Sequence, residues 1–463
     1  MSHLSPPRTM MLVAAVALIA IATANDVRSQ LGQFTARDPG VRTGGANAGG
    51  MLPNLSTLEQ RIFGIGKEAF EEVASVQGTI ADTEAGLGPR FNLDSCAGCH
   101  AHPAIGGSSP ALNPQVEVAK KAGAVNEVPS FITKDGPIRE ARFKFNSDGT
   151  ADGGVHALFT ITGRSDAPGC FLTQPDFRSA VAARNVIFRI PTPLFGAGLI
   201  EAIDDDTILA NTRALNAAKQ SLGILGRVNS ASGRPNTSGN DGTVTRFGWK
   251  AQNKSLEMFS GEAYNVEQGV TSDLFPHERD EAPGCRYNGT PESPTHYEEN
   301  RPLEVPNDVV KFAVFMRLLA APTPAPDTDS IIRGRKLFSD VGCALCHTPT
   351  LHTGKYGVAA LRDKDVNLYS DLVLHAMGAG LADDVSQGNA RGDEFRTAPL
   401  WGLGNRIFFL HDGRTKDLLE AIRAHASSAT GTYPASEANQ VTVRFNNLTE
   451  IDKQHVLNFL RAL

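Results

Sequence analysis

The spacing of apolar residues predicts helices in three places along the chain. Residues 448–463 follow Thr449, a residue type that caps helices, with an apolar stripe on one face. The stripe consists of Ile451, Val456, Phe459, Leu460 and Leu463. Residues 309–319 form a second apolar segment of helical length, and residues 418–422 form a short amphipathic one. These patterns predict a mainly helical protein.

Two long segments do not follow a helical pattern. Residues 101–180 and 200–245 are rich in Gly, Asn, Ser and Thr, which predicts loops with short strands. We interpret both segments as insertions into an otherwise helical domain. Their role is not evident from the sequence.

The N-terminus has the pattern of a secretory signal. Arg8 precedes an apolar run at 10–22, and Ala22-Thr23-Ala24 provides a small-x-small cleavage site. The run is shorter than the roughly 20 residues that a membrane-spanning helix needs, although an uncleaved anchor is the alternative. We therefore expect a signal peptide at 1–24, a flexible Gly/Asn-rich lead-in at 25–54 and a periplasmic protein without a membrane span after cleavage.

Composition narrows the class of protein further. The chain has 463 residues, of which 41% are hydrophobic and 20% charged, as expected for a soluble globular protein of several domains. Its net charge is −6 and no long Lys/Arg run occurs, so nucleic acid is not expected as a partner.

Four of the six cysteines form two copies of one motif. The motif is C-x-x-C-H, the attachment signal for c-type haem, in which two thiols bind the haem vinyl groups and the histidine binds iron. The residues are Cys96, Cys99 and His100 in the first copy and Cys343, Cys346 and His347 in the second. Two covalently bound c-type haems are therefore expected.

Two other uses of such cysteines are less consistent with the sequence. A thioredoxin-like dithiol would lie in a βαβ pattern, which neither segment has. A shared Cys₄ zinc site would need pairs separated by about 12–20 residues, and these pairs are far more distant. Cys170 and Cys285, which each end an Ala-Pro-Gly-Cys segment, are expected to form a disulfide in an oxidising compartment.

The chain repeats its own order of features. Residues 66–70 (GKEAF) precede the first motif and residues 334–338 (GRKLF) precede the second. Residues 188–198 (FRIPTPLFGAG) and 395–404 (FRTAPLWGLG) follow them. A Pro-rich linker at 320–326 separates the halves. We expect two cytochrome c-like helical domains in tandem, at 55–322 and 323–463, with the first enlarged by the insertions.

These segments resemble the bacterial di-haem cytochrome c peroxidase and MauG-like superfamily, and within it the di-haem oxidoreductase branch. Residues 189–203, 246–276, 371–383 and 395–414 carry the resemblance together with the two motifs. It implies a peroxidatic haem in the N-terminal domain and an electron-transfer haem in the C-terminal domain. It also implies hydrogen peroxide as substrate and a small soluble electron donor, a cytochrome c or a cupredoxin.

The resemblance assigns roles to single residues. Trp249 matches the tryptophan between the two haems, although a core aromatic is the alternative. Glu267 matches the catalytic acid, with a solvated surface residue as the alternative. His425 lies where relatives carry the sixth iron ligand of the second haem, usually a methionine, and Met377 and His375 are its rivals. A calcium ion lies between the domains in relatives, and Thr397 is in the matching segment.

The chain also departs from the family pattern. Phe259 stands where peroxidases carry a glutamine, and Trp249 opens a W-K-A-Q turn where W-D-G-R is usual. The distal histidine of the first haem has no clear match, since His102 is too close to the motif and His156 has no supporting pattern. These departures leave a two-haem electron carrier as the alternative to a peroxidase. A binding module with vestigial haems has little support, because both motifs are intact.

Overall fold

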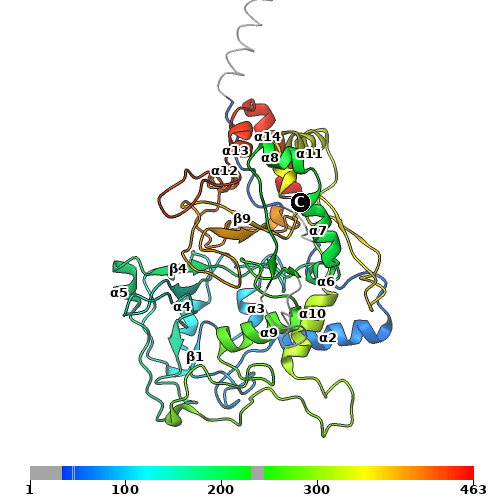
Figure 1. The fold of residues 1–463 in the computed structure, drawn as a ribbon. Helices are drawn as coiled ribbons and strands as arrows, with labels where there is room; N and C mark the ends of the chain where they lie inside the picture. The colour runs from blue at the N-terminus through cyan, green and yellow to red at the C-terminus, as the bar shows by residue number, and fades with distance from the viewer. Residues whose placement is uncertain (1–33, 44, 46, 231–243) are drawn as a thin grey trace, which may run out of the picture.

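The computed structural model describes residues 34–43, 45, 47–230 and 244–463 (Figure 1). The signal peptide expected at 1–24 lies outside these residues. No helix in the described ranges is both long enough and apolar enough to cross a bilayer.

Helices dominate the regular structure, in agreement with the mainly α prediction. The helices are α2 (Thr57–Glu71), α3 (Cys96–Cys99), α4 (Gln115–Val118), α5 (Phe177–Ala182), α6 (Ala197–Glu201), α7 (Asp205–Arg213), α8 (Asn216–Ser221), α9 (Leu256–Ala263), α10 (Asp308–Leu318), α11 (Asp329–Val341), α12 (Leu418–Arg423), α13 (Asn439–Asn446) and α14 (Glu450–Ala462). A π-helical turn, η2 (Tyr264–Gln268), extends α9.

The strands are short and pair only in twos within the described residues. The antiparallel pairs are β1 (Arg90–Phe91) with β3 (Phe159–Thr160), β2 (Glu140–Phe143) with β4 (Val186–Arg189), β5 (Asn229–Ser230) with β6 (Val244–Thr245), β7 (Leu351–His352) with β8 (Asp365–Val366), and β9 (Leu374–Ala376) with β10 (Glu394–Arg396). Strands β2, β3, β5 and β6 lie in the segments predicted to be loop-rich insertions. These segments also contain the helices α4, α7 and α8, which the prediction of loops and short strands missed.

Two helix pairs repeat the same packing. Helix α2 packs on α10 in the lower right of Figure 1, and α11 packs on α14 at the top. Each contact is closest at a glycine. A Cβ on Gly66 would lie 2.5 Å from the Lys311 carbonyl oxygen, and one on Gly334 would lie 2.0 Å from the His455 carbonyl oxygen. The two glycines hold equivalent places in the GKEAF and GRKLF repeats.

A second close approach is repeated in the same way. A Cβ on Gly198 would lie 2.0 Å from the carbonyl oxygen of Arg317 in α10, and one on Gly404 would lie 2.1 Å from that of Arg461 in α14. The repeated FRIPTPLFGAG and FRTAPLWGLG segments therefore pack against the last helix of their own half.

The largest apolar core includes residues from both sides of the Pro-rich linker. It joins Phe63 and Phe312 with Leu351, Leu368 and Trp401. A separate core lies around α11, α12, α13 and α14, and another fills the region of residues 74–177. The two halves are thus packed against each other through shared apolar side chains.

The lead-in differs from the flexible segment predicted at 25–54. Asp38 forms an ion pair with Arg461 of α14, with 2.6 Å between Oδ2 and the guanidinium nitrogen, and accepts a hydrogen bond from the Leu418 amide. The Leu52 amide donates to the Leu318 carbonyl at 2.7 Å. In the described part of this segment, the chain is therefore a strap that contacts both halves, because its polar groups find buried partners.

The apolar stripe predicted for the last helix is also slightly different. Val456, Phe459, Leu460 and Leu463 are buried in the core, whereas the Ile451 side chain is 47% exposed. Thr449 caps α14 through its side chain, which accepts from the Asp452 amide. Ile451 lies in the first turn of α14.

Gly66→Ala is expected to lower the free energy of unfolding by about 1–3 kcal/mol, because the added methyl group overlaps the α10 backbone. Gly64→Ala, in the same helix, is the matched control, since a Cβ there meets nothing within 4 Å. It should raise stability by about 0.5–1 kcal/mol through helix propensity. Denaturant unfolding of both variants measures the difference, and equal effects would contradict the packing argument.

Candidate functional site

The first C-x-x-C-H motif lies in the wall of a cavity of about 160 Å³. Cys96 and Cys99 occupy the short helix α3, which places both thiols on the cavity within one turn. The Nδ1 atom of His100 is 3.0 Å from the Gly107 carbonyl oxygen. A hydrogen bond there fixes the ring on the cavity wall, where the backbone of Thr192 is its second hydrogen-bond partner.

The second motif has the same arrangement in a separate cavity of about 220 Å³. Cys343, Cys346 and His347 line it, and the Nδ1 atom of His347 is 3.0 Å from the Tyr369 carbonyl oxygen. Burial lowers the pKa of both His100 and His347 to about 4, so both rings are neutral, the form that binds a metal.

An equivalent aromatic residue accompanies each histidine. The ring of Phe70 lies 6.0 Å from that of His100, and the ring of Phe338 lies 6.3 Å from that of His347. These phenylalanines end the repeated GKEAF and GRKLF segments. The internal repeat therefore reaches the residues around each motif.

The two sites fit c-type haem better than the other uses of paired cysteines. The two cysteine pairs line different cavities, so they do not form one Cys₄ zinc site. Burial raises the pKa of the Cys96 and Cys343 thiols to about 12, whereas reactive dithiol sites lower it. A cavity with two thiols and a neutral imidazole has the donor set that a covalently attached haem requires.

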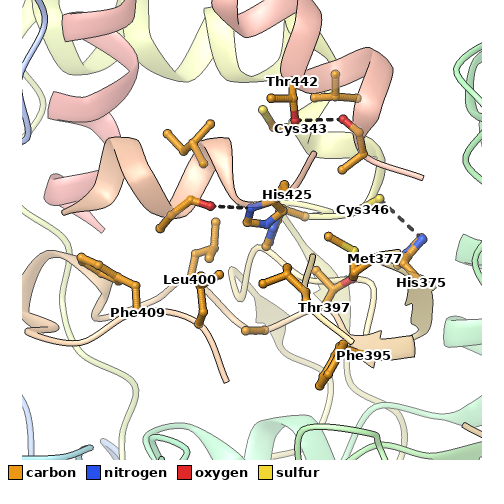
Figure 2. A pocket seen from close by; sticks show the side chains of 18 of the residues that line it. Cys343, Cys346, His375, Met377, Phe395, Thr397, Leu400, Phe409, His425 and Thr442 are labelled. Carbon is orange, nitrogen blue, oxygen red and sulfur yellow. Dashed lines mark hydrogen bonds between the residues drawn. The ribbon is translucent and has the colours of Figure 1, made fainter. Parts of the chain in front are cut away.

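His425 lies in the second cavity, in the same space as the two cysteines and Met377 (Figure 2). Its Nδ1 atom is 2.8 Å from the Ala421 carbonyl oxygen, as in the two motif histidines, so Nε2 is left for a ligand. His375 is different, because Nδ1 lies 2.7 Å from Glu437 and Nε2 lies 3.0 Å from Asp371. Both of its nitrogens are engaged. The geometry favours His425 over His375, and Met377 remains a rival.

No histidine other than His100 lines the first cavity in the described chain. His102 is directed elsewhere, with Nε2 2.7 Å from the Asn405 carbonyl oxygen. His156 pairs with Asp152 at 2.7 Å and stacks on Phe143. Neither candidate for a distal histidine lies in this cavity, and the two cavities are therefore chemically unlike.

Glu267 lines the first cavity from the π-helical turn η2. Its Oε2 atom accepts a hydrogen bond of 2.7 Å from the buried Asn92 side chain. Burial, and then the negative charge of Glu140, raise the pKa of Glu267 to about 8, against the effect of Asn92. A carboxyl group with this pKa carries a proton at neutral pH.

Trp249 lines both cavities. Its indole nitrogen donates to the Ile190 carbonyl oxygen at 2.9 Å, and its backbone carbonyl accepts from the Arg396 amide at 2.9 Å. On the side of the second cavity, its ring lies 6.4 Å from that of His411. A single aromatic side chain is therefore part of the wall of both cavities.

Phe259 lines the first cavity as well, so an apolar ring is present where relatives carry a glutamine. Several polar residues that we did not predict from the sequence also line this cavity. They are Gln115, Arg139, Glu140, Arg142, Arg189, Gln252 and Gln268. The segment at 101–180, which we predicted to be an insertion, contributes Gln115, Arg139, Glu140 and Arg142. For Glu140 and Arg142, the alternation of polar and apolar residues in Glu140–Phe143 is a signal in the sequence.

Two further expectations concern the surroundings of the haem sites. Cys170 and Cys285 are joined in a disulfide with an S–S distance of 2.08 Å. The Thr397 carbonyl oxygen accepts a 2.6 Å hydrogen bond from the Ser370 hydroxyl and one from the Arg396 guanidinium. A calcium ion bound by this oxygen would have to displace both donors.

Comparison with known proteins places the chain in a family. The model of the family described as "Di-haem oxidoreductase, putative peroxidase" matches residues 141–463. A search of curated proteins gave no match. The diheme peroxidase BthA from Burkholderia thailandensis is 15% identical with a TM-score of 0.29, over 47% of this chain and 65% of that one. The match thus spans slightly less than two thirds of that peroxidase.

Two other solved structures are similar at the same level. A MauG-like protein associated with microbial copper homeostasis is 17% identical, with a TM-score of 0.28, over 50% of this chain and 77% of that one. Hydrazine synthase from Kuenenia stuttgartiensis is 14% identical, with a TM-score of 0.35, over 93% and 98% of the two chains.

The family match defines the class of protein as an oxidoreductase enzyme with two haems. The chain belongs to the di-haem oxidoreductase family. The first motif, at 96–100, precedes the matched residues, and its cavity is completed by residues from inside the match, including Trp249 and Glu267.

His425→Ala is expected to convert the haem at 343–347 from low spin to high spin, because its remaining strong nitrogen ligand would be His347 alone. EPR and optical spectra of the ferric protein measure this change. Met377→Leu is the control and should leave the spin state as it is. If Met377→Leu converts the haem and His425→Ala does not, the ligand is Met377.

Proposed function

We propose that this chain is a periplasmic, peroxidase-like oxidoreductase with two covalently bound c-type haems. Electrons enter at the 343–347 site from a small soluble donor, a cytochrome c or a cupredoxin. They pass to the 96–100 site, where hydrogen peroxide is reduced. Family membership supports the two-haem oxidoreductase, and the cavities support the direction of electron flow.

This proposal rests on one observation, which is that the two cavities offer different sets of iron ligands. The second cavity offers His425 and Met377 in addition to His347, enough to saturate an iron. The first offers His100 and Met316 but no second histidine among the described residues, so it holds one strong nitrogen ligand where the second cavity holds two. An iron with a free position can bind a substrate, whereas a saturated one can only exchange electrons. The first site is thus the site of chemistry.

A c-type haem in the first cavity supplies the redox-active iron that reduction of a peroxide needs. The chain supplies the proton chemistry. Glu267 carries a proton at neutral pH on a carboxyl group that faces the cavity, and it can deliver this proton to the leaving oxygen of a bound peroxide. Asn92 fixes the orientation of that carboxyl group. Trp249 lies on the route between the cavities.

The tandem arrangement is part of the proposal. Domains at 55–322 and 323–463 are supported by the repeated glycine contacts of α2 with α10 and of α11 with α14, and by Phe70 and Phe338 beside the two histidines. Insertions at 101–180 and 200–245 enlarge the first domain. A cleaved signal peptide at 1–24 exports the protein.

A two-haem electron carrier is the second candidate. Phe259 in place of a glutamine and the lack of a second histidine in the first cavity favour it, because both reduce the polar groups available to a peroxide. Met316 also lines this cavity and could saturate the iron.

Cys96→Ala and Cys343→Ala should each prevent double thioether attachment at one site only. Mass spectrometry of the denatured protein measures how much haem each variant retains and on which peptide. Wild-type haem content on both peptides in both variants would contradict the assignment of the two attachment sites.

The decisive experiment for function is EPR of the matured protein, in the ferric and half-reduced states, with and without cyanide. One high-spin signal that shifts when cyanide binds is expected, from the 96–100 site. Peroxide-dependent oxidation of a reduced small cytochrome should follow. Two low-spin signals that cyanide leaves unchanged in both states would contradict the peroxidase proposal and favour the electron carrier.

A further inference from the structure

A second carboxyl group lies beside Glu267 in the first cavity. Glu140, from strand β2, lines the cavity together with Glu267, and the two side chains are in hydrogen-bonding contact. Two carboxylates repel each other, and a hydrogen bond between them forms only when one of them carries a proton. This contact therefore defines a pair that holds one proton.

The surroundings of the pair are asymmetric. The Arg142 guanidinium donates from Nε to the Oε1 atom of Glu140 at 2.5 Å. Glu267 has no such ion pair and receives only the neutral amide of Asn92. A charged donor stabilises a carboxylate more strongly than an amide does, so the negative charge resides on Glu140 and the proton on Glu267.

Other charged groups reinforce this assignment. The guanidinium groups of Arg142 and Arg189 outweigh burial and lower the pKa of Glu140. The charges that face the pair from its neighbours are those of Arg142, Arg189, Arg279 and Glu262. Arg189 is itself paired with Asp383, so Arg142 is the cation most directly available to Glu140.

We propose that Glu140 and Glu267 form a carboxyl pair that shares one proton, in which Glu140 is the positioning residue that keeps this proton on Glu267. The inference rests on the proposed function and extends it. The pair would supply the proton chemistry of the first cavity.

The proton count of O–O bond cleavage closes within such a pair. Cleavage requires that one oxygen lose its proton and that the other gain one and leave as water. Glu267 delivers its O–H proton to the leaving oxygen, and its carboxylate then accepts the proton that the other oxygen loses, while Glu140 stays ionised. Afterwards the pair again holds one proton. Complete reduction of the peroxide to two molecules of water also takes up two electrons, from the small soluble donor proposed above, and two protons from solvent.

Infrared spectroscopy of the matured protein tests the pair directly. A protonated carboxyl band that shifts in D₂O should disappear with a midpoint near pH 8 as Glu267 loses its proton. Glu267→Gln should abolish this band. Glu140→Gln should move its midpoint to lower pH by about one unit or more, because the negative neighbour is removed.

Glu278→Gln is the matched control. Burial raises the pKa of Glu278 to about 7, but this residue does not line the cavity. Its substitution should remove only its own band and leave the midpoint near pH 8 unchanged. A Glu140→Gln variant with the wild-type midpoint would overturn the pairing, as would survival of the band in Glu267→Gln.

The infrared band does not depend on whether the iron has a vacant coordination position. The peroxidase function and the carboxyl pair are therefore tested independently. If the wild type does not bind cyanide, the peroxidase function is contradicted but the carboxyl pair is not. If cyanide binds and the pair is correct, the pH dependence of binding by anionic ligands such as fluoride should move with the infrared midpoint in Glu140→Gln. A structural role of Glu140 alone would leave this pH profile unmoved.

Discussion

A buried ion cluster around Asp383 holds the junction on which both cavities depend. Asp383 pairs with Arg189 at 2.7 Å and with Lys250 at 3.0 Å, and all three side chains are almost fully excluded from solvent. The next residue after Arg189, Ile190, accepts the indole hydrogen bond of Trp249, which directly precedes Lys250. Removing one partner from such a cluster leaves an uncompensated buried charge. One carboxylate from the second half therefore fixes the ring that separates the two cavities.

The chemical difference between the cavities comes mainly from what was added to the first half. The repeat gives both halves the same helix pairs, the same phenylalanine beside the motif histidine and the same backbone acceptor for its Nδ1 atom. The first cavity then gains a wall from strand β2, which brings in two ionisable side chains. The second gains an imidazole at the end of α12. The repeated segments thus build the features that the two cavities share, and the residues outside those segments make the cavities differ.

The sequence predicted those features that depend on short contiguous segments. It did not predict those that depend on contacts between distant parts of the chain. The C-x-x-C-H motifs, the capped last helix and the resemblance around Trp249 and Glu267 all lie in short contiguous segments. Glu140 could not be found in this way, because its importance follows from the pairing of β2 with β4 and from a contact with a π-helical turn far along the chain. The docking of the lead-in was also missed, since a Gly/Asn-rich composition does not reveal that Asp38 meets a buried arginine in α14.

That strap has a consequence for how the molecule is made. Asp38 and Arg461 are 423 positions apart, so synthesis passes through both haem motifs before the partner of Asp38 exists. Contacts of such high sequence separation are slow to form, because the loop they close is long. The strap can therefore dock on the second half only after α14 has been made and has formed, which makes its docking a late step of folding.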